Sequence, residues 1–148
     1  MSEPYCLAMV LCDGIHRDVA TGKHTILGTF STFAADEFPA VLHFWVYFAI
    51  TDGIGPTELQ LRIVDASCGI ANSNNENDGI IFRAKPLLSI NIEDPLMVIE
   101  GATFIQIPLP SPGLYHCELL ANETLLMSRR LLAIQGIQSD AEEGKSDE

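Results

Sequence analysis

Strict alternation along residues 41–51 constrains the fold of this chain more than any other feature. Side chains of a β-strand point alternately to its two faces. On one face every side chain is apolar: Leu42, Phe44, Val46, Phe48 and Ile50. The opposite face carries His43, Trp45 and Tyr47. The segment therefore predicts a central strand that is buried on one side. Its other side presents a row of aromatic rings with polar groups.

Other segments predict further short strands. Residues 57–65 alternate most cleanly, with leucine and isoleucine on one face and polar side chains on the other. The remaining predicted strands span 4–13, 23–34, 80–85, 87–92, 102–109, 114–121 and 124–134. About eight short strands without alternating helices predict an all-β fold, an antiparallel β-sandwich. Gly28, inside a predicted strand, indicates a bulge or a close backbone approach.

The last predicted strand has a rival interpretation. Asn122 is a suitable N-cap for a helix through residues 123–132, where helix propensity is good. Leu125 occupies the third position after that cap, so a capping box is absent. A hairpin with Asn122 and Glu123 at its tip fits the preceding strand better, and we favour it.

Length and composition predict one domain over residues 1–136 and an acidic, disordered tail over 137–148 that is dispensable for folding. The net charge is −12 from 20 acidic and 8 basic residues. Because phosphate binding needs a basic surface, this balance argues against nucleic acid as a partner and against an anionic membrane. No convincing signal peptide or membrane span is present, which predicts a cytoplasmic protein.

The four cysteines are Cys6, Cys12, Cys68 and Cys117, and none forms a CxxC pair. The Tyr115-His116-Cys117 run is similar to the Tyr-x-Cys of an immunoglobulin strand, with Trp45 upstream. In a reducing compartment we nevertheless expect four free thiols.

The order of several motifs resembles a known family. Leu11-Cys12-Asp13 is followed by Leu27-Gly28-Thr29-Phe30, Phe38-Pro39-Ala40, Leu61-Arg62-Ile63-Val64-Asp65 and Pro112-Gly113-Leu114-Tyr115. Over residues 4–134 this order is similar to that of uncharacterised bacterial single-domain proteins with a predicted immunoglobulin-like sandwich. The resemblance implies that fold. It implies no activity, ligand or catalytic residue.

No motif in the sequence predicts catalysis, a cofactor or a metal centre. Lys23 follows Gly22, but the residues around the pair do not match a phosphate-binding loop. The four histidines are scattered, and no Gly-x-Ser-x-Gly motif occurs. The sharpest ligand hypothesis is calcium at one end of the sandwich, where Asp13 and Asp52 would end two strands at the same pole. Ordinary Asp-Gly turns explain the same residues.

The sequence therefore predicts a non-catalytic binding or assembly module. Its partner-binding residues are His43, Trp45 and Tyr47, because Trp and Tyr are enriched at the energetic centres of interfaces. The partner would be an unidentified protein or a second copy of the chain. The opposing interpretation is that another segment covers the row and forms a second small core. A small enzyme or a calcium-dependent binding domain near Asp13 and Asp52 is the alternative function.

Overall fold

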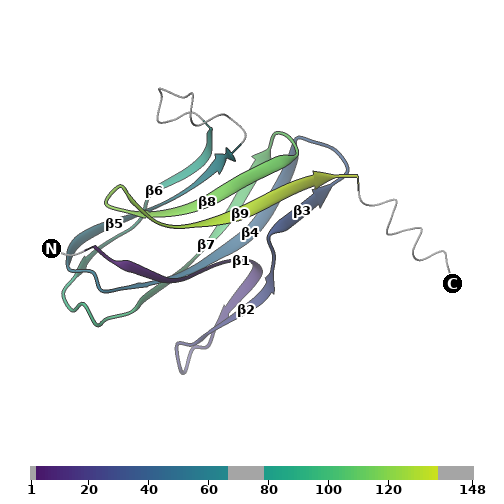
Figure 1. Cartoon of the computed structure of the whole chain (residues 1–148). Coiled ribbons are helices and arrows are strands. Elements are labelled where there is room, and N and C mark those ends of the chain that lie inside the picture. Colours follow the sequence, from purple (N-terminus) through teal and green to yellow (C-terminus); the bar gives the residue numbers. More distant parts are fainter. Residues whose placement is uncertain (1–2, 67–78, 137–148) are drawn as a thin grey trace.

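The computed structural model describes residues 3–66 and 79–136, and these residues form nine strands (Figure 1). In chain order the strands are β1 (Tyr5–Arg17), β2 (His24–Thr29), β3 (Thr32–Ala35), β4 (Ala40–Thr51), β5 (Gly55–Asp65), β6 (Ile80–Ile92), β7 (Ile99–Leu109), β8 (Gly113–Ala121) and β9 (Thr124–Gln135). No α-helix forms within these residues. The predicted acidic tail lies outside the described part of the chain.

The strands form two sheets that pack face to face. One sheet has four strands in the order β2-β1-β4-β7, and the other has five in the order β3-β9-β8-β5-β6. All pairings are antiparallel except that of β3 with β9, which is parallel. The predicted all-β sandwich is confirmed at this level, but two strand boundaries differ. Residues 23–34 divide into β2 and β3, which belong to different sheets, whereas the predicted strands 80–85 and 87–92 join into the single strand β6.

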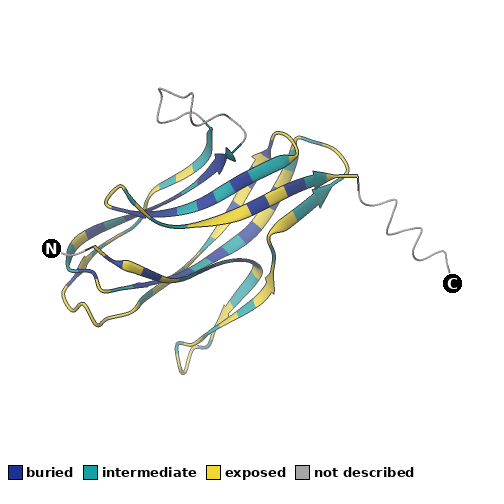
Figure 2. Ribbon diagram, viewed as in Figure 1, coloured by how far each residue is buried: buried dark blue, intermediate teal, exposed yellow. Residues whose placement is uncertain are grey.

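The core lies between the sheets and is built on the apolar face of β4. Leu42, Phe44, Val46, Phe48 and Ile50 are all buried, as the alternation predicts. Leu59, Leu61 and Ile63 of β5 are fully buried opposite them. Figure 2 shows the resulting alternation of buried and exposed positions along the central strands. The sequence period of two therefore assigned the inward face of both strands correctly.

The last segment is a strand rather than a helix. β8 and β9 form an antiparallel hairpin that closes with the pair Ala121 and Thr124. At its tip Asn122 and Glu123 have positive φ angles of 48° and 71°. Asparagine tolerates this left-handed conformation better than most residues, which suits a two-residue hairpin turn. The hairpin interpretation is confirmed.

Gly28 and Gly101 mark close approaches of the backbone to neighbouring side chains. Gly28 has φ of +68°, and a Cβ added there would lie 2.5 Å from Asp13 Oδ2. A Cβ on Gly101 would lie 2.4 Å from the ring of Phe48. Neither position accommodates a side chain without movement, so the close approach predicted at Gly28 is confirmed.

A tyrosine fixes the turn before β8. Tyr115 is fully buried, and its hydroxyl donates to the Ser111 carbonyl over 2.6 Å. Cys117 follows two residues later on the same inward face and is also buried. The buried ring and its backbone hydrogen bond thus anchor the connection between β7 and β8 to the core.

Candidate functional site

The predicted row of His43, Trp45 and Tyr47 lies on the outer face of the four-stranded sheet. All three side chains project from β4, which is flanked by β1 and β7. His43 is exposed, whereas Trp45 and Tyr47 are half-buried. The row is therefore neither fully open nor fully covered, and its two ends have different surroundings.

Tyr47 belongs to a polar network at the covered end. Its hydroxyl donates a short hydrogen bond to the Glu100 carboxylate of β7. His24 of β2 lies against the same groups, with ring centroids 5.2 Å apart for His24 and Tyr47 and with Nδ1 3.5 Å from Glu100 Oε2. Burial, and then the Glu100 hydrogen bond and charge, raise the pKa of Tyr47 to about 12. The phenol therefore stays neutral at physiological pH and acts as a donor.

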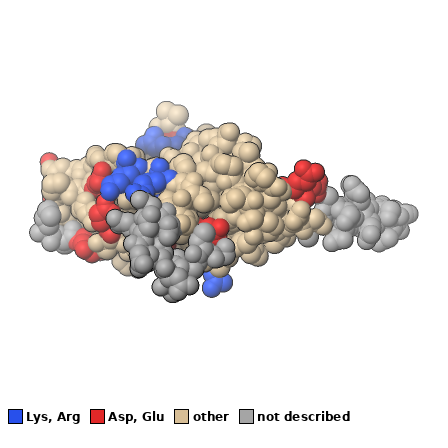
Figure 3. Space-filling model, turned by 90° about the horizontal axis from the view of Figure 1, so that it is seen from above, with Lys and Arg blue, Asp and Glu red and all other residues tan. Residues whose placement is uncertain are grey.

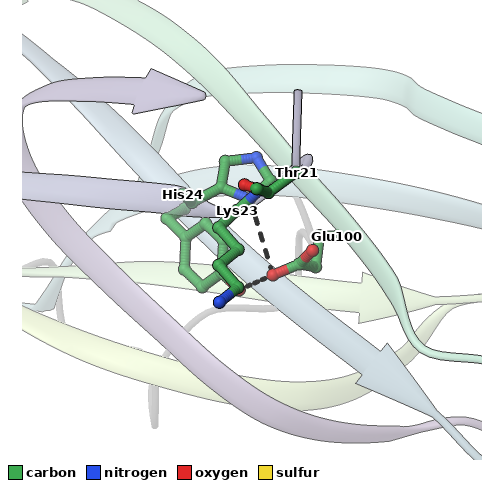
Figure 4. A network of polar contacts seen from close by, with 5 residues as sticks. Thr21, Lys23, His24 and Glu100 are labelled. Atoms are coloured by element: carbon green, nitrogen blue, oxygen red, sulfur yellow. Dashed lines mark hydrogen bonds and ion pairs between the residues drawn. The ribbon is translucent and has the colours of Figure 1, made fainter. Parts of the chain in front are cut away.

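These contacts show that the β1–β2 hairpin folds across the outer face of its own sheet. β2 and β7 are the two edges of the strand order, yet His24 of β2 reaches Glu100 of β7. Figure 4 shows Thr21, Lys23 and His24 beside Glu100. β1 pairs with β4 only as far as Cys12 and then departs from it, which permits the crossing.

Beneath the hairpin is a pocket of about 540 Å³ with mixed charge. Its walls are Ile15, Arg17, His24, Trp45, Glu100, Gly101 and Ala102. At the hairpin tip, the Asp18 carboxylate accepts hydrogen bonds from the Thr21 hydroxyl and amide over 2.6 Å and 3.0 Å. The Thr21 hydroxyl bond, more than the amide bond, lowers the pKa of Asp18. The hairpin thus has a stable turn and covers the Tyr47 end of the row.

The opposite end of the row is an open aromatic patch, which we define as Val41, His43, Trp45 and Phe104. Phe104 of β7 pairs with Trp45 across the sheet and is 49% exposed. Its ring stacks on His43 with centroids 6.4 Å apart and an interplanar angle of 7°, and it lies 5.4 Å from Trp45 at a tilt of 54°. Val41 extends the patch and is 51% exposed.

Phe104 was missed by reasoning from sequence. Its outward position follows from Ile105 and Ile107, which occupy the inward face of the same strand. The alternation within one strand does not reveal which residue of the neighbouring strand lies opposite. The rings of Phe104 and Trp45 come together only through the register of β4 with β7.

The two carboxylates of the calcium hypothesis are far apart. β1 runs antiparallel to β4, with Tyr5 opposite Thr51 and Cys12 opposite Trp45. Asp52 therefore lies beside the start of β1, while Asp13 lies beyond its middle. At about 3.3 Å per residue the separation exceeds roughly 20 Å. The prediction of a shared pole is wrong, because β1 and β4 are antiparallel neighbours, which places their carboxyl ends at opposite poles of the sheet.

The described residues contain no group of three or more histidine, cysteine, aspartate or glutamate side chains arranged to hold a metal. Cys6, Cys12 and Cys117 are buried free thiols, as expected, and Cys68 lies outside the described residues. Burial raises the pKa of Cys117 to about 12, so this thiol stays protonated. Residues 3–66 and 79–136 contain no helix that is long and apolar enough to cross a membrane.

These features define a two-sheet β-sandwich with a partly covered aromatic face. The chain belongs to a family of unknown function, DUF6941, whose model matches residues 7–134. This match confirms the resemblance to an uncharacterised family. No curated protein matches the chain.

A solved structure shares the fold. It is the Pseudomonas fluorescens alkylpurine DNA glycosylase AlkC bound to DNA containing an abasic site analog. The TM-score is 0.55 at 12% identity, and the match covers 91% of this chain and 31% of the glycosylase chain. The chain thus spans about a third of the length of the protein it matches. At this identity the likeness establishes the fold alone.

That match corrects two predictions. The sequence predicted a non-catalytic module without a nucleic-acid partner, but a chain that contains a similar sandwich is a DNA glycosylase, an enzyme, bound to DNA. Missing catalytic motifs and a negative total charge are therefore insufficient grounds for either exclusion. Net charge is a sum over the molecule, whereas binding depends on local charge. Figure 3 shows lysine and arginine side chains gathered in one part of a face that also carries acidic ones.

Proposed function

We propose that this chain is a protein-binding module whose contact surface is the aromatic patch of Val41, His43, Trp45 and Phe104. The observation that carries the proposal is Phe104, a large ring that is half exposed and lies between two other rings. Trp and Tyr are the residue types that dominate interface energies, and contiguous apolar surface commonly marks an interaction site. Phe104 widens the predicted row into such a surface.

The geometry of the patch supports recognition of a folded or extended protein segment. Its rings come from two adjacent strands of a sheet whose other face is the core, so their positions are held by backbone hydrogen bonds. A preorganised surface loses little conformational entropy on binding. The hairpin over Tyr47 borders the patch and would limit the approach of a partner from that side.

Charge favours a basic partner over a second copy of the chain. Two copies of a molecule with net charge −12 repel each other, especially at low ionic strength. A partner bearing lysine or arginine is attracted instead, and its cations gain further from the faces of Trp45 and Phe104. We therefore commit to a basic protein segment as the occupant.

Two finer assignments belong to the same proposal. An immunoglobulin-like topology is supported by the Tyr115 hydroxyl bond to the backbone and by Cys117 two residues later, both typical of that fold. A cytoplasmic location in a bacterial cell is supported by three buried free thiols, which are common where thiols stay reduced.

The experiment compares capture by the wild type with capture by patch variants. Phe104→Ser and the double variant His43→Ala/Phe104→Ser remove the patch, while Val19→Ser removes an apolar side chain that is 94% exposed in the hairpin turn. Circular dichroism first establishes that each variant is folded. A basic protein that binds both the wild type and Val19→Ser, then loses at least about tenfold in affinity with Phe104→Ser, supports the proposal.

Two results would overturn it. One is binding of the protein partner that is unchanged in the double variant, which would move the contact surface elsewhere. The other is a patch-dependent interaction with a labelled DNA duplex but with no protein. This arm is included because the structural match is bound to DNA.

A further inference from the structure

Each sheet of the sandwich ends in two edge strands, and β7 is the edge that is both long and regular. β2 and β3 are edges of only six and four residues. β6 is long, but its pairing with β5 has two register shifts, and Arg83, Lys85 and Pro86 lie in its middle. Short strands, bulges, charges and proline are the usual means by which an edge is protected from pairing with another chain.

β7 lacks these protections over most of its length. It pairs with β4 without interruption from Ile99 to Leu109. Glu100 is its only charged residue and Pro108 its only proline, and they lie near opposite ends. The stretch between them is therefore a regular, uncharged edge, and its exposed side chains include Phe104 of the aromatic patch.

A contact between β1 and β4 shows which backbone groups of β7 point outward. In an antiparallel pair, the N–H and C=O of one residue point to the same side, and this side alternates along the strand. The Trp45 carbonyl accepts a hydrogen bond from the Cys12 thiol over 3.7 Å, so the backbone groups of Trp45 point towards β1. Phe104 lies opposite Trp45, and its own N–H and C=O therefore point away from β4.

Two independent observations agree with this direction. The Leu11 carbonyl is bonded to the Phe30 amide, so Leu11 points away from β4, and Val46 opposite it points towards β7. Because the direction alternates, the residue before Val46 again points towards β1. Pro108 has the same phase as Phe104, and proline is tolerated on an edge strand where its nitrogen faces solvent.

The outward backbone groups of Ala102, Phe104 and Gln106 form a row of donors and acceptors beside the aromatic patch. All three residues are exposed. Within residues 3–66 and 79–136, neither a loop nor a side chain bonds to these groups. An extended backbone is the partner that satisfies such a row, because its own donors and acceptors recur at the same spacing.

The surroundings of this edge favour a basic strand. Residues 93–112 carry three acidic side chains and no lysine, arginine or histidine. On the outer face, a side chain of an added strand would lie beside Phe104, where a lysine or arginine gains from the face of the ring. On the inner face, an apolar side chain would continue the core beyond Thr103 and Ile105. The edge therefore suits a segment in which basic and apolar residues alternate.

We propose that β7 binds an extended basic segment of another protein as a fifth strand of its sheet. This inference rests on the proposed function, since it specifies how the partner that contacts the aromatic patch is held. Main-chain hydrogen bonds to residues 102–106 provide affinity, and side chains at alternate positions provide specificity. A second copy of the chain is a poorer occupant, because it would bring two acidic edges together.

The test uses the full chain and a fluorescently labelled peptide of about nine residues in which lysine and valine alternate. Gln106→Pro removes one outward donor and leaves the rings of the patch in place, whereas Gln106→Ala removes the same side chain and keeps the donor. Circular dichroism establishes that both variants are folded. By fluorescence anisotropy, we expect the wild type and Gln106→Ala to bind alike and Gln106→Pro to bind at least about fivefold more weakly.

A second measurement alters the peptide and leaves the protein unchanged. Methylation of the lysine amide nitrogens blocks one edge of the extended peptide, and methylation of the valine amide nitrogens blocks the other. Strand addition predicts that one of these two peptides loses binding and the other retains it. A contact made through side chains alone predicts equal binding of both.

Three results would overturn the proposal: no binding of the unmethylated peptide, equal binding by Gln106→Pro and Gln106→Ala, or equal binding of the two methylated peptides. A dimer in sedimentation that Gln106→Pro dissociates would make a second copy the occupant and overturn the choice of partner. Phe104→Ser separates the two proposals, because it removes the patch and keeps the outward donors. A basic protein lost by Phe104→Ser but retained by Gln106→Pro excludes strand addition and leaves the protein-binding function intact.

Discussion

At the scale of single residues, the row on β4 shows how one strand face can have two environments. Tyr47 faces Glu100 and His24 beneath the hairpin, while His43 stacks on Phe104 in the open. Trp45 belongs to both environments, since it lines the pocket beneath the hairpin and also touches Phe104 in the open patch. Removal of Trp45 should therefore affect stability and binding together, which makes Phe104 the cleaner position for testing function.

Tyr47 should make stability depend on pH in the alkaline range. Its pKa is about 12 in the folded protein, whereas an unfolded tyrosine ionises near 10. Between these values the unfolded state releases a proton that the folded state retains. The free energy of unfolding therefore falls as pH rises through this window, and below it Tyr47 contributes its full effect.

The measurement is chemical denaturation at several pH values across this window, together with a tyrosinate absorbance titration, on wild type and Tyr47→Phe. The variant should lose the most alkaline tyrosine step and show a shallower fall in stability. Cys117 also ionises near 12 but is present in both proteins, so the difference reports Tyr47. Superimposable titrations would contradict the assignment.

At the scale of elements, the β1–β2 hairpin is the segment whose position depends most on a few polar contacts. It leaves β4 after Cys12, and its tip is held to the sheet by the contacts of His24 with Tyr47 and Glu100. Segments with few buried apolar contacts open more readily than the core. The hairpin is thus the element through which access to Trp45 can change.

We expect Glu100→Gln to loosen the hairpin while the sandwich stays folded. The amide removes the negative charge that faces His24 and accepts more weakly from Tyr47. Hydrogen exchange should quicken across β2 and remain unchanged in β8. Glu123→Gln, which alters an exposed ion pair with Lys85, is the control and should leave β2 unaffected. Equal exchange in β2 of both variants would show that apolar packing alone holds the hairpin.

At the scale of the whole molecule, the net negative charge lowers the stability of the folded state and favours association with basic partners. A charge of −12 repels itself, and salt screens this repulsion with a Debye length of about 8 Å at physiological ionic strength. The isolated protein should therefore become more stable as sodium chloride rises from about 0.01 M to about 0.15 M, as measured by urea denaturation. Association with a basic partner should weaken over the same range. A protein that loses stability with added salt would indicate that its few cations, not its acids, dominate the surface field.

The strand faces could be predicted because burial follows a period of two that is visible in one segment alone. Phe44 and Leu61 needed no partner strand to be assigned inward. The candidate site depends instead on the register between β4 and β7 and on the β1–β2 hairpin, which crosses the outer face of its own sheet. The approach of Phe104 to Trp45 comes from pairing, and the approach of His24 to Glu100 comes from a hairpin that leaves its sheet. Asp13 was misplaced because neither segment alone shows that β1 and β4 pair antiparallel, which puts Asp13 and Asp52 at opposite poles.

The parallel pair of β3 and β9 has a consequence for how the protein forms during synthesis. β3 has been made long before its only strand neighbour, β9, leaves the ribosome. The same late strand supplies Arg129 to the waiting carbonyl of Met9. Until then β8 and β3 both have unsatisfied edges, and contacts so distant in sequence form slowly. The second sheet therefore closes in one late step, and a nascent chain halted before Thr124 is the form most exposed to aggregation.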